Sequence, residues 1–235
     1  MIETRGLTKR FGDKIAVNGL DLKIDEGEFF CFLGPNGAGK TTTIKMLTGL
    51  IRPTDGSARV GPYDVVEQPV EAKRLLGYIP DHPFLYDKLT GREFMAFVAG
   101  LYRIPKARFD ELCEPLLDTF ELGAVAHQLT ENFSHGMRQK LSFASCFLHE
   151  PRVVVVDEPW VGLAPKNIRS VKTYLRRRTR EDGLTILMST HTLSIAEEVA
   201  DRIGIIQAIK VLLTRSISLT LQVFPARRSD PDNPE

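Results

Sequence analysis

The sequence predicts an α/β fold that combines a mostly parallel core sheet, an N-terminal antiparallel β subdomain and an inserted α-helical subdomain. Apolar and polar residues alternate over residues 14–24, which is typical of a half-exposed antiparallel strand. Residues 29–33 and 153–156 are continuous apolar runs, which are typical of strands buried in a parallel sheet. Helical patterns separate these buried runs, and such an alternation of strands and helices favours the α/β class.

The N-terminal part of the chain predicts strands followed by a helix. Residues 2–33 contain two or three strands, the last of which is the buried run at 29–33. A helix is predicted from Lys40 onward, because apolar residues recur at helical spacing until Gly49 ends the pattern. Residues 56–65 are predicted to form a further antiparallel β segment.

Between about residues 83 and 150 the pattern becomes helical, which predicts the inserted subdomain. Thr90 and Glu93 have the spacing of a capping box, while Pro105 and Ser134 suit the starts of two further helices. After the run at 153–156, the sequence predicts a basic helix over 166–181, a strand over 184–190, a helix over 193–201 and a strand over 203–206.

Length and composition indicate an ordinary globular chain. With 235 residues, one α/β domain with an inserted lobe fits better than two independent domains. Apolar residues make up 43% and charged residues 26%, which excludes a wholly disordered or fibrous chain. Lysine and arginine number 31 against 30 acidic residues, so charge gives no drive toward nucleic acid, and no nucleic-acid partner is expected.

The cysteines and the hydropathy pattern favour a cytosolic location. Cys31, Cys113 and Cys146 lie far apart, without the spacing of a zinc site, and are expected to be reduced thiols in the core. The N-terminus lacks the apolar segment of a secretory signal. Lys210 and Arg215 interrupt the longest apolar stretch, so no membrane span is expected and any membrane role would pass through another chain.

The first chemical motif is a phosphate-binding loop. Gly34, Gly39, Lys40 and Thr41 follow the pattern Gly-x4-Gly-Lys-Thr, between a predicted buried strand and a predicted helix. The glycines let the backbone N–H groups and the helix N-terminus surround a phosphate. Lys40 would neutralise phosphate oxygens, and the Thr41 hydroxyl would be a ligand for Mg²⁺.

The second motif is an acidic pair after the run at 153–156. Asp157 ends this buried strand, where a carboxylate beside a phosphate loop can hold Mg²⁺. Glu158 follows directly and could polarise an attacking water. Taken without the phosphate loop, the pair fits solvated acids at a strand end equally well, and the loop is what favours the catalytic interpretation.

Two further features are ambiguous when only the residues are considered. Ser134 and Gly136 lie at a predicted helix N-terminus, which suits either a simple helix cap or a second anion-binding end. His191 follows a strand at the edge where α/β sheets bind ligands, although a single histidine there often has a structural role.

Together, the ordered motifs resemble the ATP-binding subunits of ABC transporters, and most of all exporter subunits of the multidrug and bacitracin-resistance type. The segment GPNGAGKT resembles the Walker A loop of P-loop NTPases, and VVVVDEP resembles the Walker B motif with its catalytic glutamate. FSHGMRQ is similar to the ABC signature, and His191 matches the switch histidine. The resemblance covers residues 2–206, which are expected to form the ATP-binding domain, with the helical subdomain inserted at about 83–150.

This resemblance implies ATP and Mg²⁺ as ligands. The implied catalytic residues are Glu158, His191 and Lys40, and the implied metal ligands are Thr41, Asp157 and Asp81. The residues implied to bind ATP are Phe11, which would stack on adenine, together with Gly34, Pro35, Asn36, Gly37, Ala38, Gly39, Lys40, Thr41, Thr42, Ser134 and Gly136.

The resemblance also implies partners. In this family two ATP molecules lie between two head-to-tail subunits, so Ser134 and Gly136 would contact the γ-phosphate held by Lys40 of the other subunit. The expected assembly is a homodimer, or a pseudo-dimer with a paralogue, bound to a separate transmembrane permease subunit. Such a protein would be cytoplasmic and peripheral on the cytoplasmic face of the membrane.

At several positions the sequence departs from the family pattern. The signature has Phe133, His135 and Met137 in place of leucine, glycine and glutamine. Asp81 aligns with the glutamine that usually reaches Mg²⁺, and Ala164 replaces an aspartate after the catalytic glutamate. The resemblance ends near residue 206, so 207–235 are expected to form an atypical tail that lacks the usual hairpin partner and is disordered over its last ten residues.

We therefore expect an ATP-hydrolysing subunit of an ABC exporter, in which ATP closes the dimer. One alternative is a non-transport ABC ATPase, although the single cassette without sustained heptads disfavours it. Another is a nucleotide-binding regulatory protein impaired in hydrolysis, which Asp81 and Ala164 would suit. For the exporter, the expected docking surface for the membrane partner is the apolar set Phe84, Leu85, Tyr86 and Phe94, and burial of these residues in the lobe core is the alternative of equal weight.

Overall fold

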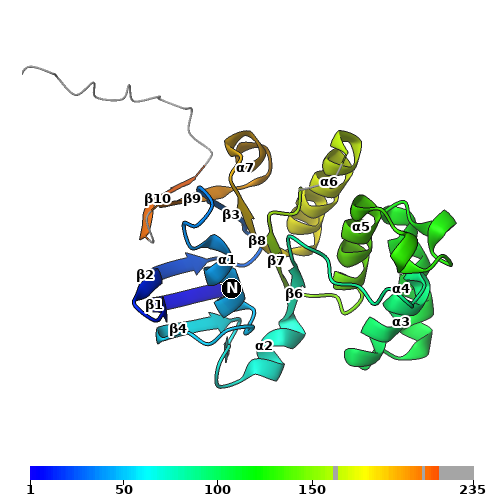
Figure 1. Cartoon of the computed structure of the whole chain (residues 1–235), viewed down its shortest axis with the longest axis horizontal. Helices are drawn as coiled ribbons and strands as arrows, with labels where there is room; N and C mark the ends of the chain where they lie inside the picture. The colour runs from blue at the N-terminus through cyan, green and yellow to red at the C-terminus, as the bar shows by residue number, and fades with distance from the viewer. Residues whose placement is uncertain (161–163, 208–209, 217–235) are drawn as a thin grey trace, which may run out of the picture.

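The computed structural model describes residues 1–160, 164–207 and 210–216. Two sheets and a helical lobe make up these residues (Figure 1). The smaller sheet is antiparallel and has the strand order β2-β1-β4-β5. Its strands are β1 (Ile2–Phe11), β2 (Lys14–Ile24), β4 (Asp55–Val60) and β5 (Tyr63–Asp64).

The larger sheet has the order β10-β9-β3-β8-β7-β6 among the described residues. Its strands are β3 (Phe29–Leu33), β6 (Leu76–Ile79), β7 (Val153–Asp157), β8 (Thr185–Thr190), β9 (Arg202–Gln207) and β10 (Lys210–Ser216). Neighbouring strands are parallel except β9 and β10. Asp157 lies opposite Ser189 and Leu33 lies opposite Thr190, so the carboxyl ends of β3, β7 and β8 meet at one edge. Ligands of α/β proteins bind at this edge.

The helices flank the larger sheet or form the lobe. The α-helices are α1 (Lys40–Leu47), α2 (Pro69–Leu75), α3 (Gly91–Leu101), α4 (Lys106–Thr119), α5 (His135–Cys146), α6 (Pro165–Asp182) and α7 (Leu193–Val199). Short 3₁₀ helices follow α4 at Gly123–Val125 and precede α5 at Thr130–Asn132. In Figure 1, α3, α4 and α5 lie on the side of the molecule opposite the antiparallel sheet.

Both predicted side-chain caps form in the lobe. The Thr90 hydroxyl accepts the N–H of Glu93 at 3.2 Å, and the Glu93 carboxylate accepts the N–H of Thr90 at 2.8 Å. The Ser134 hydroxyl likewise accepts the N–H of Met137 at 3.2 Å, at the start of α5. These bonds satisfy N–H groups that a helix start leaves free, so the capping signals placed both helix starts correctly.

Half of the expected docking surface is buried. Phe84 is 80% exposed and Tyr86 48% exposed, but Leu85 is only 4% exposed and Phe94 only 7%. Leu85 and Phe94 belong to the hydrophobic core that joins the lobe to one face of the larger sheet. The prediction that these two residues contact a partner is therefore wrong, because they pack inside the lobe.

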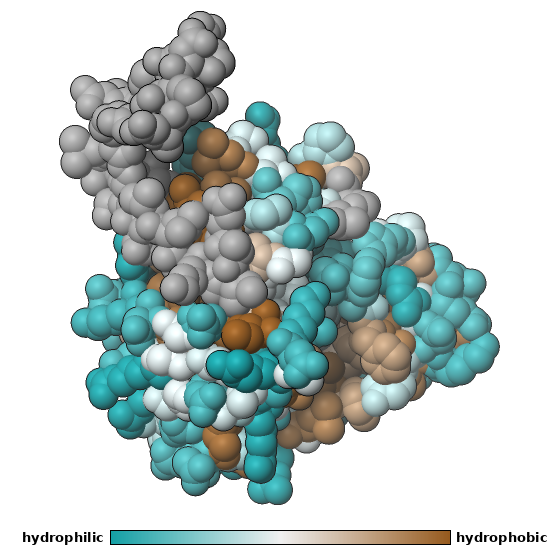
Figure 2. Space-filling view, turned by 60° about the vertical axis from the view of Figure 1, so that its left-hand side comes forward, coloured by the Kyte–Doolittle hydropathy of each residue, from teal (hydrophilic) through white to brown (hydrophobic). Residues whose placement is uncertain are grey.

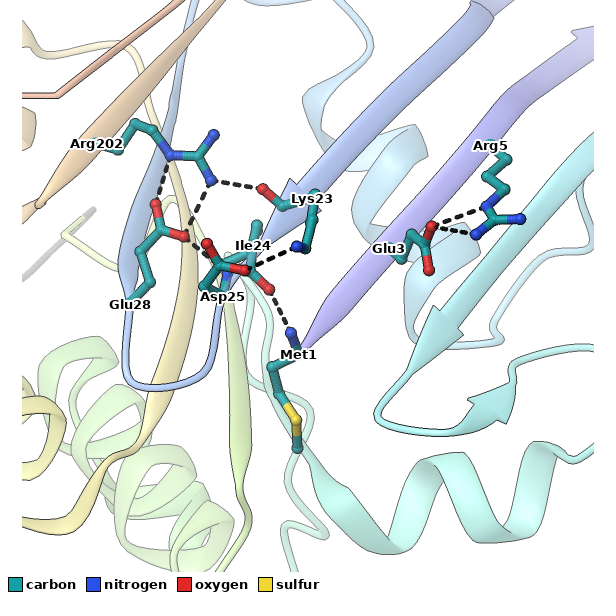
Figure 3. Close-up of polar contacts among 8 residues, drawn as sticks. All are labelled: Met1, Glu3, Arg5, Lys23, Ile24, Asp25, Glu28 and Arg202. Carbon is teal, nitrogen blue, oxygen red and sulfur yellow. Dashed lines mark hydrogen bonds and ion pairs between the residues drawn. The ribbon is translucent and has the colours of Figure 1, made fainter.

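Arg202 links the two sheets at the end of β2. Its guanidinium bonds the Glu28 carboxylate at 2.6 Å and the carbonyl of Lys23 at 2.5 Å (Figure 3). It also lies 4.9 Å from the centre of the Phe30 ring. The terminal amine of Met1 donates to the carbonyl of Ile24 at 2.5 Å in the same region. These contacts tie the antiparallel sheet to the strand that leads into the phosphate loop.

Most predicted elements form, but the sequence analysis missed α2 and β6. The expectation that the tail lacks a hairpin partner is wrong for 210–216, because the backbone of β10 pairs antiparallel with β9. The expected disorder of the last ten residues lies outside the described residues.

The three cysteines lie in the core, as the sequence predicts. Cys31, Cys113 and Cys146 are buried free thiols. None of the helices in the described ranges combines the length and hydropathy needed to cross a membrane. Hydrophilic residues cover most of the face in Figure 2, where apolar residues form separate patches.

Candidate functional site

The phosphate loop, residues 34–39, connects the buried strand β3 to α1. Gly39 caps the helix with a φ of 103°, and a Cβ atom there would lie 2.6 Å from the carbonyl oxygen of Ala16. A Cβ on Gly34 would clash with the carbonyl of Ile206. Only glycine fits either position, so these two residues allow the tight curl that directs backbone N–H groups toward a phosphate.

Lys40 is held at the mouth of this loop. Its side chain is 5% exposed, and its ammonium donates to the carbonyl of Gly34 at 2.6 Å and to that of Pro35 at 3.2 Å. It also lies 3.2 Å from Oε1 of Glu158. A buried ammonium in a glycine-containing loop at a helix N-terminus is an arrangement suited to a polyanion.

Asp157 is fully buried at the carboxyl end of β7. The Ser189 hydroxyl donates to its Oδ1 at 2.5 Å, whereas Oδ2 is buried without a hydrogen-bond partner. The pKa of this carboxyl is raised above its usual value, mainly by burial and also by the charges of Asp81 and Glu158, while the hydroxyls of Ser189 and Thr41 act in the opposite direction. A buried carboxylate oxygen without a partner fits a cation, which would compensate the cost of desolvation.

Glu158 adopts a strained backbone conformation beside this aspartate. Its φ is 43°, in the left-handed region that residues with a Cβ rarely adopt, and its N–H donates to the Ser189 hydroxyl at 3.0 Å. Strain of this kind persists only where the surrounding structure fixes it, and it is common at functional sites. The side chain lies between Lys40 and His191, with Oε2 at 2.9 Å from Nδ1 of His191.

These groups border a pocket of about 510 Å³, here called the phosphate-loop pocket. The residues lining it are Phe11, Lys14, Ile15, Ala16, Pro35, Asn36, Gly37, Gly39, Lys40, Thr41, Thr42, Asp81 and Glu158. The structure thus brings together most of the residues expected to bind the phosphates, the Phe11 ring and two of the expected carboxylates. Gly34 and Ala38 are buried in the loop beneath the pocket, and Asp157 is buried at the adjacent strand end.

Asp81 lines this pocket from the segment after β6. Burial raises the pKa of Asp157 and that of Tyr78, and the negative charge of Asp81 raises both further. The Asp81 side chain is 46% exposed and accepts the N–H of His82 at 2.9 Å. An aspartate here offers the oxygen ligands that Mg²⁺ prefers.

Ser134 and Gly136 lie in a different pocket. It has a volume of about 260 Å³ and is here called the α5 pocket; its lining residues are Ser134, His135, Gly136, Met137, Lys140, Ala164 and Asn167. No residue lines both this pocket and the phosphate-loop pocket among the described residues. Within one chain, the structure therefore does not bring Ser134 and Gly136 to Lys40.

Sequence reasoning missed three kinds of site residue. Ser189 bonds both Asp157 and the backbone of Glu158, a role that only the strand register reveals. Lys14 lines the phosphate-loop pocket beyond any motif. Lys140 and Asn167 line the α5 pocket from two helices. None of these residues carries a local sequence signal, because the folded chain brings them to the sites from separate elements.

Comparison with protein families gives a match to the ABC transporter family model over residues 17–161. The chain is 36% identical over 212 residues to the bacitracin transport ATP-binding protein BcrA of Bacillus licheniformis, covering 90% of this chain and 68% of that protein. It is 37% identical over 211 residues to the daunorubicin/doxorubicin resistance ATP-binding protein DrrA of Streptomyces peucetius, covering 90% of this chain and 64% of the relative. The chain thus spans about two thirds of the length of these relatives.

Solved structures give the same result for the fold. The chain superposes on the structure of the ATP-binding subunit of an ABC transporter with a TM-score of 0.86 and 31% identity, covering 92% of this chain and 90% of the other. It also matches the dimeric ATP-binding cassette MJ0796 bound to ADP and Pi, with a TM-score of 0.85, 24% identity and coverage of 94% and 100%. The predicted α/β fold, with its antiparallel sheet, mostly parallel sheet and helical lobe, is confirmed.

Proposed function

The chain belongs to the ABC transporter family of ATP-binding proteins, whose members are ATPases, and on that premise we propose that it hydrolyses ATP to drive a separate transmembrane exporter subunit. The observation that carries the proposal is the position of Glu158. Its carboxylate lies between Lys40 and His191, directly after a buried aspartate with an unpartnered oxygen. This is the arrangement that attack of water on a bound phosphate requires.

We assign ATP to the phosphate-loop pocket. The triphosphate would lie against the backbone of residues 34–39 and the start of α1, where the helix N-terminus and the N–H groups favour negative charge. The ammonium of Lys40 would move from Glu158 to the β- and γ-phosphate oxygens. The Glu158 carboxylate would then be available to the attacking water.

The proposed reaction is attack of a water oxygen on the γ-phosphorus. Glu158 accepts a proton from that water as the new P–O bond forms. The bond between the γ-phosphorus and the β–γ bridging oxygen breaks, and ADP leaves with its electron pair. His191, 2.9 Å from the Glu158 carboxylate, holds that carboxylate in orientation.

Asp157 is the proposed centre of the Mg²⁺ site, with Thr41 and Asp81 beside it. Its Oδ2 atom is buried and has no partner, and the hydroxyl of Thr41 is near enough to lower the pKa of the same carboxyl. Bound Mg²⁺ would neutralise charge that develops on the transferred phosphoryl group.

The domain boundaries proposed are 2–206 for the ATP-binding domain, with the helical subdomain at about 83–150.

We further propose a head-to-tail dimer, formed with a second copy or a paralogue. The α5 pocket holds an uncharged hydroxyl and a helix N-terminus but lies apart from Lys40 of its own chain. In a head-to-tail dimer, Ser134 and Gly136 would reach the γ-phosphate bound to the other chain, and ATP would close the interface. Dimerisation therefore gives the α5 pocket a ligand that its own chain cannot supply.

The proposed contact with the membrane subunit is an aromatic patch on the lobe, formed by Phe84, Tyr86 and Phe97. The ring centres lie 5.9 Å apart for the first pair and 5.0 Å apart for the second. Phe84 is 80% exposed, and an exposed cluster of apolar side chains often marks an interaction site. Aromatic side chains tend to contribute most of the binding energy at interfaces. The assembly would place the protein on the cytoplasmic face of the membrane.

The segment that carries this patch is connected to the phosphate-loop pocket and to α5. Asp81 lines the phosphate-loop pocket three positions before Phe84. One residue after Tyr86, the Asp87 carboxylate accepts two hydrogen bonds at 3.0 Å from the guanidinium of Arg138 in α5. A segment that bonds α5 and that would contact both the nucleotide and the membrane subunit is well placed to couple them.

Glu158→Gln tests the proposed hydrolysis. We expect the variant to bind ATP but to hydrolyse it about 10²–10⁴-fold more slowly, because it lacks the proton acceptor. It should accumulate as an ATP-bound dimer on size exclusion. Glu71→Gln makes the same change on the exposed face of α2 and should leave the rate unaltered. Equal turnover in Glu158→Gln and the unsubstituted chain would overturn the assignment.

A further inference from the structure

A groove between α6 and α7 is separate from both pockets described above. It has a volume of about 420 Å³ and is here called the α6–α7 groove. The charged residues that line it are Lys172, Arg176, Arg177, Arg180, Glu181 and Glu198. None of these residues lines the phosphate-loop pocket or the α5 pocket. Four cations against two carboxylates leave the groove with a surplus of two positive charges.

Lys172 is the one buried residue among these six, with 9% of its surface exposed. Its ammonium donates to the carboxylate of Glu198 at 2.5 Å and lies 5.9 Å from the centre of the Trp160 ring. Glu198 is its only hydrogen-bond partner within the described residues, whereas an ammonium has three donors. Burial of an ammonium is costly when its donors stay unfilled, so a second acceptor in the groove would stabilise it.

The guanidinium groups of the groove are only partly paired. Arg176 donates to the carboxylate of Asp201 at 2.7 Å, and Asp201 does not line the groove. Arg177 lies 3.9 Å from the carboxylate of Glu181, which is beyond hydrogen-bond distance. Arg180 is exposed and has no hydrogen bond or ion pair within the residues that the structure describes. Arg177 and Arg180 are therefore available to an anion.

The helix dipole explains only part of this arrangement. The carboxyl end of a helix favours cations, and Arg180 lies in the last turn of α6. The effect falls off within that turn, so it does not account for Lys172, Arg176 or Arg177. The dipole therefore accounts for one of the four cations.

The surplus charge and the shape of the guanidinium group favour a phosphate. A guanidinium presents its N–H donors in a planar fork that matches two oxygens of a phosphate. A phosphate monoester carries about 1.5 to 2 negative charges at pH 7, close to the surplus in the groove. The groove volume lies within the range of about 300–1,000 Å³ that is common for small-molecule sites. A nucleic acid would fit less well, because Glu181 and Glu198 would repel its successive phosphates.

We infer that the α6–α7 groove binds a small phosphate dianion, which is either inorganic phosphate or the phosphate group of a small organic molecule. Arg177 and Arg180 would bond the phosphate oxygens, and Lys172 would share its ammonium between the phosphate and Glu198. The site does not depend on the proposed hydrolysis of ATP. It adds an anion site to α6 and to α7, which begins two residues after His191.

Equilibrium dialysis with radiolabelled inorganic phosphate at fixed ionic strength tests the site. The measurement uses the full chain with Lys40→Ala, because the phosphate-loop pocket is a second place where phosphate could bind. We expect this variant to retain one saturable phosphate site per chain. Adding Arg180→Gln should weaken binding to that site about tenfold, because it removes a charge-assisted hydrogen bond. The same loss should appear at one phosphate site of the chain that keeps Lys40, so the test does not depend on the folding of Lys40→Ala.

Arg169→Gln is the matched control. It removes an exposed guanidinium from the same helix, and Arg169 does not line the groove, so phosphate affinity should stay constant. Competition identifies the source of the phosphate. Displacement of the label by glycerol 3-phosphate at a lower concentration than by unlabelled phosphate would assign the site to a phosphate monoester, and the reverse order would assign it to inorganic phosphate.

Absence of saturable phosphate binding in a folded Lys40→Ala variant would overturn the inference. Equal weakening by Arg169→Gln and Arg180→Gln would also overturn it, because binding would then follow net charge alone. Failure of this inference can be told apart from failure of the proposed function. Phosphate binding without ATPase activity in the unsubstituted chain would contradict the proposed function alone, and ATPase activity without a phosphate site that depends on Arg180 would contradict this inference alone.

Discussion

Lys40 and Asp157 are buried charged groups at the phosphate-loop pocket, whereas Ser134 presents an exposed hydroxyl at the α5 pocket. Lys40 and Asp157 are almost entirely shielded from solvent, and the orientation of Glu158 is fixed at a positive φ. Ser134 is exposed, and its hydroxyl is occupied in capping α5. Buried charges are costly unless a ligand or counter-ion compensates them, but an exposed cap carries no such cost.

This difference explains why the two pockets require different tests. The phosphate-loop pocket contains the groups for phosphate and metal chemistry within one chain, so changes there should act on binding and on the chemical step. The α5 pocket is satisfied as a helix cap, so changes there should affect a second process, the pairing of two chains. Separating these effects requires control variants that change the stability of the fold by a similar amount.

The largest expected effect follows Gly39→Ala. The new Cβ would lie 2.6 Å from the carbonyl oxygen of Ala16 at a φ of 103°, so the loop must deform and ATP affinity should fall about 100-fold or more. Gly100→Ala in α3 is the control, because nothing lies within 4 Å of its Cβ and alanine favours a helix. Fluorescent ATP titration measures both, and wild-type affinity in Gly39→Ala would contradict the geometry of the loop.

A smaller effect, confined to turnover, is expected for Ser134→Ala. We expect hydrolysis to fall about tenfold or more, while ATP affinity of the single chain stays constant, because the hydroxyl acts only on nucleotide bound to the other copy. Thr90→Ala removes the comparable cap of α3, at a similar cost of about 1 kcal/mol in unfolding free energy. If both variants lose the same activity, Ser134 is only a helix cap.

The smallest expected effect concerns the aromatic patch. Phe84→Ala and Tyr86→Ala should each weaken co-purification with a detergent-solubilised membrane subunit about tenfold, because exposed aromatic anchors are lost. ATP affinity should not change. Val70→Ala alters another exposed apolar residue, in α2, and should bind the membrane subunit normally. Normal retention of the subunit by both aromatic variants would place the docking surface elsewhere.

Local motifs predicted the phosphate-loop pocket well. Lys40, Asp157 and Glu158 lie in short contiguous motifs that indicate their chemistry. The capping residues Thr90 and Ser134 each lie directly before the helix that they cap, so they also give a local signal. The features that were missed depend on the fold. Ser189 reaches its position through strand register, and register is a property of two distant segments.

The docking segment shows the same limit. In 84–86 the side chains alternate between exposed and buried, so composition identifies an apolar segment but not the face that each residue presents. Phe94 satisfies the same sequence pattern as the exposed aromatics, yet α3 turns it into the lobe core. The direction of a side chain in a short segment depends on packing that the local sequence does not encode.

Mixing two inactive variants tests most directly the claim that each catalytic site takes the phosphate-loop pocket from one chain and the α5 pocket from another. Lys40→Ala disables the first pocket and Ser134→Arg blocks the second, so each variant alone should be inactive. In an equal mixture, half of the dimers combine the two variants and retain one intact site, so ATPase activity should recover to about a quarter of the wild-type rate. If both variants fold and pair but the mixture stays inactive, or if Ser134→Arg alone retains full activity, the two-chain site is contradicted.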